Sequence, residues 1–240
     1  DNGYRYYSLG QYFIFEIIVS LRKLGVSLKE IGNYVHHRDI ESLQTLLLNK
    51  VLEYDLQIEL LERNKRNILI NVERLKQAKE VRSNRITLEQ CEEEYFVADN
   101  FYGLKSSMKD QVKSIARHSL PFAKNEIFNE YFMGYILLQE ALLSEEYMTI
   151  TQIFTQVSDP GEYPKAVIKP KGFYAKIVAS DGYHSNYKKI IGKMMDFIRL
   201  NNLKIVGNAY IKPLKNYWTT ANLKEYVTQI AIQVDYIDSD

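Results

Sequence analysis

The chain lacks most features of a secreted, metal-binding or membrane protein. Its 240 residues include one cysteine, so no disulfide can form within the chain and no multi-thiolate metal site is available. No apolar run approaches the roughly 20 residues that a helix needs to cross a bilayer, and no signal peptide opens the chain. We therefore expect no cofactor, no membrane contact and a location in a reducing cytoplasm.

An excess of charge of one sign is also missing. Residues 1–90 carry 14 Lys and Arg against 12 Asp and Glu, and residues 91–240 carry 17 against 18. Neither part is the strongly basic domain typical of nucleic-acid binders, so a DNA-binding function needs a local motif as evidence. Tyrosine, in contrast, is abundant at 19 residues, and a hydrophobic content of 46% is enough to build a core.

Helical periodicity marks the first part of the chain. Apolar residues recur at helical spacing from Leu9 to Leu24, and Gly25 ends that helix because glycine readily adopts the left-handed C-terminal conformation. Ser27 and Glu30 form a capping box, which predicts a second, short helix.

A heptad pattern follows from about residue 39 to residue 79. It predicts one helix of about 60 Å at 1.5 Å per residue. A seam of that length needs a second helix to cover it, so we predict a homodimer; the alternative is a long helix packed on the chain's own C-terminal domain. Lys65 in the seam would select register and orientation. The predicted apolar seam residues are Leu47, Val51, Tyr54, Ile58, Leu61, Ile68, Val72 and Leu75.

After residue 85 the period changes from 3.6 to mostly 2. We expect strands near 92–102, 130–142, 148–157, 166–179, 203–213 and 226–235, and helices near 108–119 and 185–201. Residues 151–157 (TQIFTQV) return as residues 228–234 (TQIAIQV), and each copy ends a strand–helix–strand–strand order. The pattern predicts a duplicated α+β domain, with a pseudo-two-fold sheet, helices on one face and a cleft at the junction.

Two local motifs resemble the MerR family of transcription regulators. Residues 2–7 (NGYRYY) resemble the family's wing, N-G-Y-R-x-Y, and residues 20–31 (SLRKLGVSLKEI) resemble its next segment, S-L-(K/R)-x-(I/L)-G-x-x-L-x-E. The long helix lies where this family places an antiparallel dimerisation helix. The duplicated region resembles the GyrI-like effector-binding domain of the BmrR-like, drug-sensing branch.

The resemblance implies a fold of three parts. These are a partial winged-helix DNA-binding domain over residues 1–38, a dimerisation coiled-coil helix over 39–82 and a GyrI-like ligand-binding domain over 83–240. The family places a helix-turn-helix before the wing, so roughly 40 further residues would be expected upstream of the chain. Without them we expect the 240 residues not to bind DNA sequence-specifically.

By the same resemblance, Arg5, Tyr6 and Arg22 match positions that contact the DNA backbone. A guanidinium group donates to phosphate through two parallel hydrogen bonds, and a tyrosine hydroxyl adds a neutral one. Such contacts would set position and affinity without reading the base sequence. The alternative is that the tyrosines pack the wing and both arginines are only solvated.

In the resembling domains, flat lipophilic cations enter an aromatic pocket and meet a buried carboxylate. Here the family pattern V-Y-E reads AYI at residues 209–211, and the acidic position of the last strand is Gln229. We therefore expect a neutral or weakly charged aromatic ligand, unless Glu130 or Glu140 supplies a carboxylate from another strand. The predicted ligand-binding residues are Tyr131, Phe132, Tyr135, Tyr174, Tyr187, Tyr210, Ile211 and Gln229.

The resemblance implies a ligand-responsive regulator whose dimer distorts promoter DNA so that RNA polymerase can engage. Its partners would be double-stranded promoter DNA, an aromatic or lipophilic effector, a second copy of the chain and, indirectly, the polymerase. We expect no enzymatic activity, because the carboxylates that could activate water are missing at residues 211 and 229. The alternatives are a GyrI-like hydrolase of small molecules and a drug-sequestering module that does not bind DNA.

Overall fold

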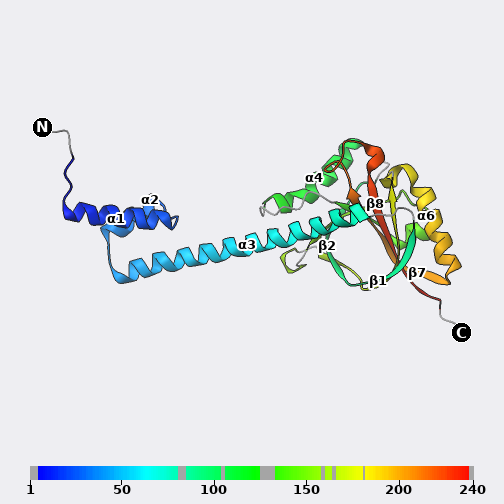
Figure 1. Cartoon of the computed structure of the whole chain (residues 1–240), viewed down its shortest axis with the longest axis horizontal. Helices are drawn as coiled ribbons and strands as arrows, with labels where there is room; N and C mark the ends of the chain where they lie inside the picture. Colours follow the sequence, from blue (N-terminus) through cyan, green and yellow to red (C-terminus); the bar gives the residue numbers. More distant parts are fainter. Residues whose placement is uncertain are drawn as a thin grey trace. The chain divides into compact units, whose positions relative to one another are not determined.

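Regular structure falls into two units along the chain, and each is described by itself. The computed structural model describes residues 5–80, 85–103, 106–124, 133–157, 160–163, 166–180 and 182–237. The first unit ends at Glu62 and the second begins at Arg63, so the boundary lies inside helix α3 (Ile40–Glu80; Figure 1). The functional division into residues 1–38, 39–82 and 83–240 stays a prediction.

The first unit begins with two capped helices, α1 (Leu9–Lys23) and α2 (Leu28–His36). The side chains of Ser8 and Ser27 accept hydrogen bonds at the two N-termini, and both helices have complete capping boxes. Gly25, with a φ of +72°, ends the first helix, as the sequence predicts. Leu21, Val26 and Ile31 form a small core, against which the first turns of α3 pack.

The second unit contains one antiparallel sheet of eight strands, ordered β1-β6-β8-β7-β3-β4-β2-β5. Its strands are β1 (Ile86–Cys91), β2 (Glu94–Asn100), β3 (Gly134–Leu137), β4 (Gln152–Val157), β5 (Ala166–Lys169), β6 (Gly172–Ser180), β7 (Leu203–Lys215) and β8 (Val227–Tyr236). Its helices are α4 (Met108–Lys124), α5 (Gln139–Leu143) and α6 (Gly182–Leu200), with 3-10 turns η1 (Pro160–Glu162) and η2 (Leu223–Glu225).

The strand order confirms the predicted duplication. The elements β2-α4-β3-β4 and β6-α6-β7-β8 follow one order, so β2 corresponds to β6, β3 to β7 and β4 to β8. Across the centre of the sheet the strands lie in the order β6-β8-β7-β3-β4-β2, in which the second three strands repeat the first three in reverse. The two repeats meet where β3 pairs with β7, with Tyr135 opposite Ile211. A pseudo-two-fold axis at this junction therefore relates the two halves of the sheet.

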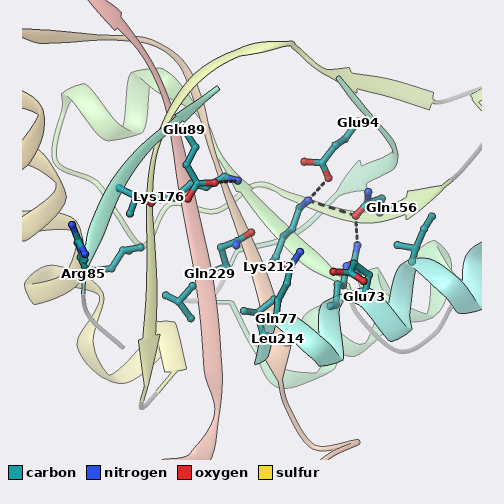
Figure 2. Close-up of a pocket in the computed structure, with 15 residues that line it drawn as sticks. Glu73, Gln77, Arg85, Glu89, Glu94, Gln156, Lys176, Lys212, Leu214 and Gln229 are labelled. Carbon is teal, nitrogen blue, oxygen red and sulfur yellow. Dashed lines mark hydrogen bonds and ion pairs between the residues drawn. The ribbon is translucent and has the colours of Figure 1, made fainter. Parts of the chain in front are cut away.

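The two faces of the sheet have different coverings. Ile190, Ile191 and Met194 of α6 pack with inward residues of the strands to form the larger core, and α4 contacts β2 and β4. Because side chains alternate along a strand, the neighbouring residues point to the opposite face. That opposite face carries a second, aromatic cluster, and the C-terminal part of α3 lies against it (Figures 1 and 2).

The structure differs from the expected elements in three places. Residues 86–91 form a strand that the periodicity did not indicate, and residues 139–143 form α5 where a strand was expected to continue. The expected strand 166–179 is two strands, β5 and β6, because Pro170 lacks the N–H that would continue the ladder. Within the described residues, no helix is both long and apolar enough to span a membrane.

Candidate functional site

Four aromatic rings form a cluster on the sheet face opposite α6. Phe96 and Phe154 stack with their ring centroids 4.2 Å apart, and Tyr210 lies 5.5 Å from Phe96. Tyr174 meets Tyr210 edge to face at 6.3 Å and donates a hydrogen bond of 2.7 Å from its hydroxyl to the carbonyl oxygen of Pro170. These residues come from four strands, and all four are buried.

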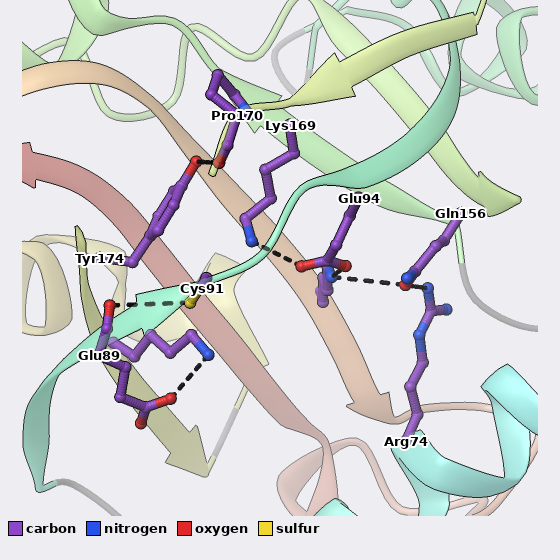
Figure 3. A network of polar contacts seen from close by, with 10 residues as sticks. Arg74, Glu89, Cys91, Glu94, Gln156, Lys169, Pro170 and Tyr174 are labelled. Carbon is purple, nitrogen blue, oxygen red and sulfur yellow. Dashed lines mark hydrogen bonds and ion pairs between the residues drawn. The ribbon is translucent and has the colours of Figure 1, made fainter. Parts of the chain in front are cut away.

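A carboxylate on the same side of the sheet, that of Glu94, is held between two lysines (Figure 3). Lys169 of β5 donates to one oxygen of Glu94 at 2.6 Å, and Lys212 of β7 donates to the other. Lys212 also reaches the amide oxygen of Gln156 at 3.5 Å, and that oxygen accepts a second hydrogen bond of 2.6 Å from Arg74 of α3. The sheet and the end of α3 are thus joined through one partly buried polar network.

The network sets the charge states of its members. Burial alone would raise the pKa of Glu94, but the charges of Lys212 and Lys169 outweigh it and lower that pKa to about 2. Burial, together with the charges of Arg74 and Lys169, lowers the pKa of Lys212 to about 8 against the attraction of Glu94. Burial and the nearby carboxylate raise the pKa of Tyr210 to about 12, so its hydroxyl stays neutral.

Beside this network is a cavity of about 620 Å³, within the size range of small-molecule sites (Figure 2). Its wall combines the polar network with a few apolar side chains. A second ion pair, between Glu89 of β1 and Lys176 of β6 at 2.8 Å, forms another part of the wall. The lining residues are Ile70, Glu73, Arg74, Gln77, Arg85, Thr87, Glu89, Glu94, Gln156, Lys176, Ile177, Val178, Lys212, Leu214 and Gln229.

The structure does not bring the predicted ligand-binding residues together. Gln229 lines the cavity, and Tyr174 and Tyr210 belong to the aromatic cluster beside it. Tyr135, Tyr187 and Ile211, in contrast, pack in the larger core on the other face. Tyr131 and Phe132 lie outside the described residues. The ligand-binding set therefore remains a prediction, and its described members lie on two sides of one sheet.

The alternation of side chains explains this division. Tyr210 and Ile211 are neighbours on β7, so they cannot both face one cleft. With Tyr210 on the aromatic face, Lys212 points to the same side and Ile211 is buried in the core, 1% exposed. The side chain of residue 211 therefore does not reach the aromatic face, and Glu140 is exposed on α5.

The predicted DNA-contacting residues lie in the first unit. Arg5 and Tyr6 precede α1 and are exposed. Arg22 donates a hydrogen bond of 3.0 Å to the carbonyl oxygen of Val26, so it also stabilises the turn between α1 and α2. Contact of these three residues with DNA stays a prediction.

An acid, a histidine and a hydroxyl are hydrogen-bonded on the α4 side of the sheet. The imidazole of His118 contacts Asp99 at 2.9 Å and Thr155 at 2.8 Å. The order is that of a catalytic triad, but His118 is fully buried and Thr155 is 2% exposed, so a substrate has no access to the hydroxyl. Burial lowers the pKa of His118 despite Asp99, and the group acts as a structural link between α4 and the sheet.

No protein-family model matches the chain. The chain is 26% identical over 236 residues to the multidrug-efflux transporter 2 regulator of Bacillus subtilis (strain 168), which covers 98% of this chain and 84% of that protein. Among solved structures, it is similar to EcmrR in a complex with DNA, with a TM-score of 0.51 and 18% identity over 99% of this chain and 88% of that one. The resemblance to MerR-type regulators is confirmed.

The order of elements agrees with a MerR-type chain. Two short helices precede the long helix α3, and the duplicated, GyrI-like sheet follows it. The carboxylate of this site is the partly buried Glu94 of β2, which is none of the acids considered from the sequence, and two lysines pair with it. Sequence reasoning missed all three residues. The period-2 spacing of Glu94 with Phe96, and of Lys212 with Tyr210, was the signal that could have found two of them.

Proposed function

We propose that this chain is a ligand-responsive transcription regulator of the MerR type. Its second unit binds an aromatic or lipophilic small molecule, and a dimer distorts promoter DNA so that RNA polymerase can engage. The observation that carries the proposal is the cavity of about 620 Å³ beside the aromatic cluster, in a chain similar to a multidrug-efflux transporter regulator. Ligand would act by binding two states of the dimer unequally.

A panel of lipophilic aromatic compounds tests the ligand-binding function. We expect at least one class to raise the melting temperature of the purified chain, since a ligand that binds only the folded state stabilises it. Val178→Phe narrows the cavity and is expected to abolish that shift. Val167→Phe makes the same change on β5, away from the cavity lining, and should leave the shift intact. An equal response of all three chains would contradict binding in this cavity.

The exposed seam of α3 supports the proposed homodimer. Leu61 is 66% exposed in the single chain and Ile58 is 53% exposed, although both occupy seam positions of the heptad. Apolar side chains repeated at this spacing along a 41-residue helix fit an antiparallel coiled coil with a second copy. The predicted seam continues through Leu47, Val51, Tyr54, Ile68 and Val72, each of them exposed.

Leu61→Lys tests the dimer because it places a charge in the centre of the seam. We expect sedimentation velocity to show monomers where the unchanged chain forms dimers. Leu56→Lys is the matched control, because Leu56 is 68% exposed on the same helix but lies outside the seam. A dimer that survives Leu61→Lys, or is lost with Leu56→Lys, would contradict the predicted register.

The hydrolase alternative finds little support in this site. A general base must take a proton from water, and its pKa should lie near the working pH. Glu94 is the carboxylate of the network, and its pKa of about 2 makes it a weak base. Both of its oxygens already accept hydrogen bonds from lysines. We therefore propose binding and not turnover at this cavity.

A further inference from the structure

The protein's own ammonium groups occupy the positions over the aromatic rings. Lys169 places its Nζ atom 4.2 Å from the centroid of the Tyr174 ring and 5.9 Å from that of Tyr210. Lys212 places its Nζ atom 5.1 Å from the centroid of the Phe96 ring. These are cation–π distances, so the negative faces of three rings already have cations on them.

The same two ammonium groups bind the only carboxylate of this network within the described residues. Lys169 is 1% exposed and Lys212 is 9% exposed, and each donates to Glu94. One negative charge between two positive charges leaves one positive charge in excess within this trio. Burying a net charge is costly, so a site of this kind gains free energy when an opposite charge enters. The neighbouring pair of Glu89 and Lys176 is balanced and adds no excess.

The excess charge borders the cavity. Lys212, Glu94 and Gln156 all line it, so a ligand can approach the ammonium group from that side (Figure 2). Arg74, which donates to Gln156, adds a guanidinium group to the same part of the wall. Apolar side chains from three elements, Ile70, Val178 and Leu214, line the cavity as well. The wall thus matches a molecule with one anionic group and an apolar body.

We propose that this cavity binds an organic anion with an aromatic or aliphatic body, and that Lys212 contacts its anionic group. The inference rests on the proposed small-molecule function and names the ligand class. A lipophilic cation is disfavoured, because it would have to displace Lys169 and Lys212 from both the rings and Glu94. The lysine pair is therefore the specificity-determining feature of the site.

Three probes of matched shape test the charge preference of the unchanged chain by calorimetry. They are 1-naphthoate, 1-naphthalenemethanol and 1-naphthylmethylammonium, which differ in charge on one ring system. We expect naphthoate to bind about tenfold or more tightly than the other two, because a charge-assisted hydrogen bond is stronger than a neutral one. Its affinity should also fall with added salt more than that of the neutral probe.

Lys212→Met is expected to reduce naphthoate affinity about tenfold and to leave the neutral probe unaffected. Lys212→Arg keeps the charge and should retain the preference for the anion. Lys171→Met is the matched control, because Lys171 is an exposed lysine paired with Glu92 and does not line the cavity. The fluorescence of Trp218, the chain's one tryptophan, reports whether each variant keeps the fold of the second unit.

The outcomes separate this inference from the proposed function. Tighter binding of the ammonium probe, or equal binding of all three, overturns the anion preference and leaves small-molecule binding standing. An unchanged naphthoate affinity in a folded Lys212→Met chain overturns the role of that lysine. If none of the three probes binds, the inference is wrong, and the wider compound panel then decides whether the proposed function also fails.

Discussion

Replacing Glu94 with glutamine is expected to lower the free energy of unfolding of the second unit by about 3 kcal/mol at neutral pH. The amide keeps the size of the carboxylate but leaves the buried ammonium groups of Lys169 and Lys212 without their counter-charge. The pKa of Glu94 gives a similar size, because a fall from 4.5 to about 2 corresponds to about 3 kcal/mol at 1.36 kcal/mol per unit. Urea unfolding followed by Trp218 fluorescence measures the loss.

The pH dependence of this effect has a definite sign. The folded state depresses the pKa of Glu94, so it binds this proton less readily than the unfolded state. The stabilisation is therefore fully present above pH 4.5 and is lost as the pH falls towards 2. We expect the Glu94→Gln chain to show a flatter dependence of unfolding free energy on pH across this window.

Glu92→Gln is the matched control for this prediction. Glu92 lies two residues earlier and pairs with Lys171 at 2.9 Å, but its side chain is 76% exposed. Exposed ion pairs contribute about 0–1 kcal/mol, so the control should lose little stability. Equal losses in the two variants would show that the pairing of Glu94 with two buried lysines is not the cause.

Gly134→Ala is expected to destabilise the second unit by about 2–3 kcal/mol, because the added methyl group has no space. A Cβ atom on Gly134 would lie 2.4 Å from Cζ of Phe154 and 2.7 Å from the carbonyl oxygen of Ile211. The ring cannot move freely, since it stacks on Phe96, and the carbonyl belongs to the strand paired with β3. The loss would appear as a lower urea midpoint in the same fluorescence assay.

Gly192→Ala provides the opposite result from the same substitution. Gly192 lies inside α6, and a Cβ atom there meets nothing within 4 Å. Alanine in a helix interior is more favourable than glycine by about 0.5–1 kcal/mol, so this variant should be slightly more stable. A loss of stability with Gly192→Ala, or none with Gly134→Ala, would contradict the packing described here.

The duplicated sheet explains why residue 134 must be glycine. Gly134 pairs with Phe154 across two strands of the first repeat, and the equivalent pair in the second repeat is Tyr210 with Ala231. In the first repeat the aromatic residue is Phe154 on the last strand, and in the second it is Tyr210 on the middle strand. The residue opposite it is small in both repeats. The sequence repeat of residues 151–157 and 228–234 indicated the duplication, but it did not show this exchange.

Local patterns in the sequence indicated the longer helices and the duplicated sheet. Capping residues at Ser8 and Ser27 satisfy N–H groups of their own helices, and the heptad pattern of residues 39–79 is a property of one helix. The repeated element order fixed the symmetry of the sheet, because equivalent segments form equivalent strands. These features need few contacts from distant parts of the chain.

The composition of the candidate site was decided by the tertiary structure. Lys169 lies 75 residues after Glu94 in the sequence, and Lys212 lies 118 residues after it. No spacing rule connects residues so far apart. Glu94 and Lys169 lie opposite each other because β5 pairs with β2. Lys212 joins them because side chains alternate along a strand, which places all three on one face of the sheet. The sequence by itself indicated the strands of the two repeats and the family that the chain resembles, but not β1 or the break between β5 and β6. Only the folded sheet decided which face carries Tyr210 and Lys212 and which face buries Ile211, since the face of a residue depends on the register of its strand.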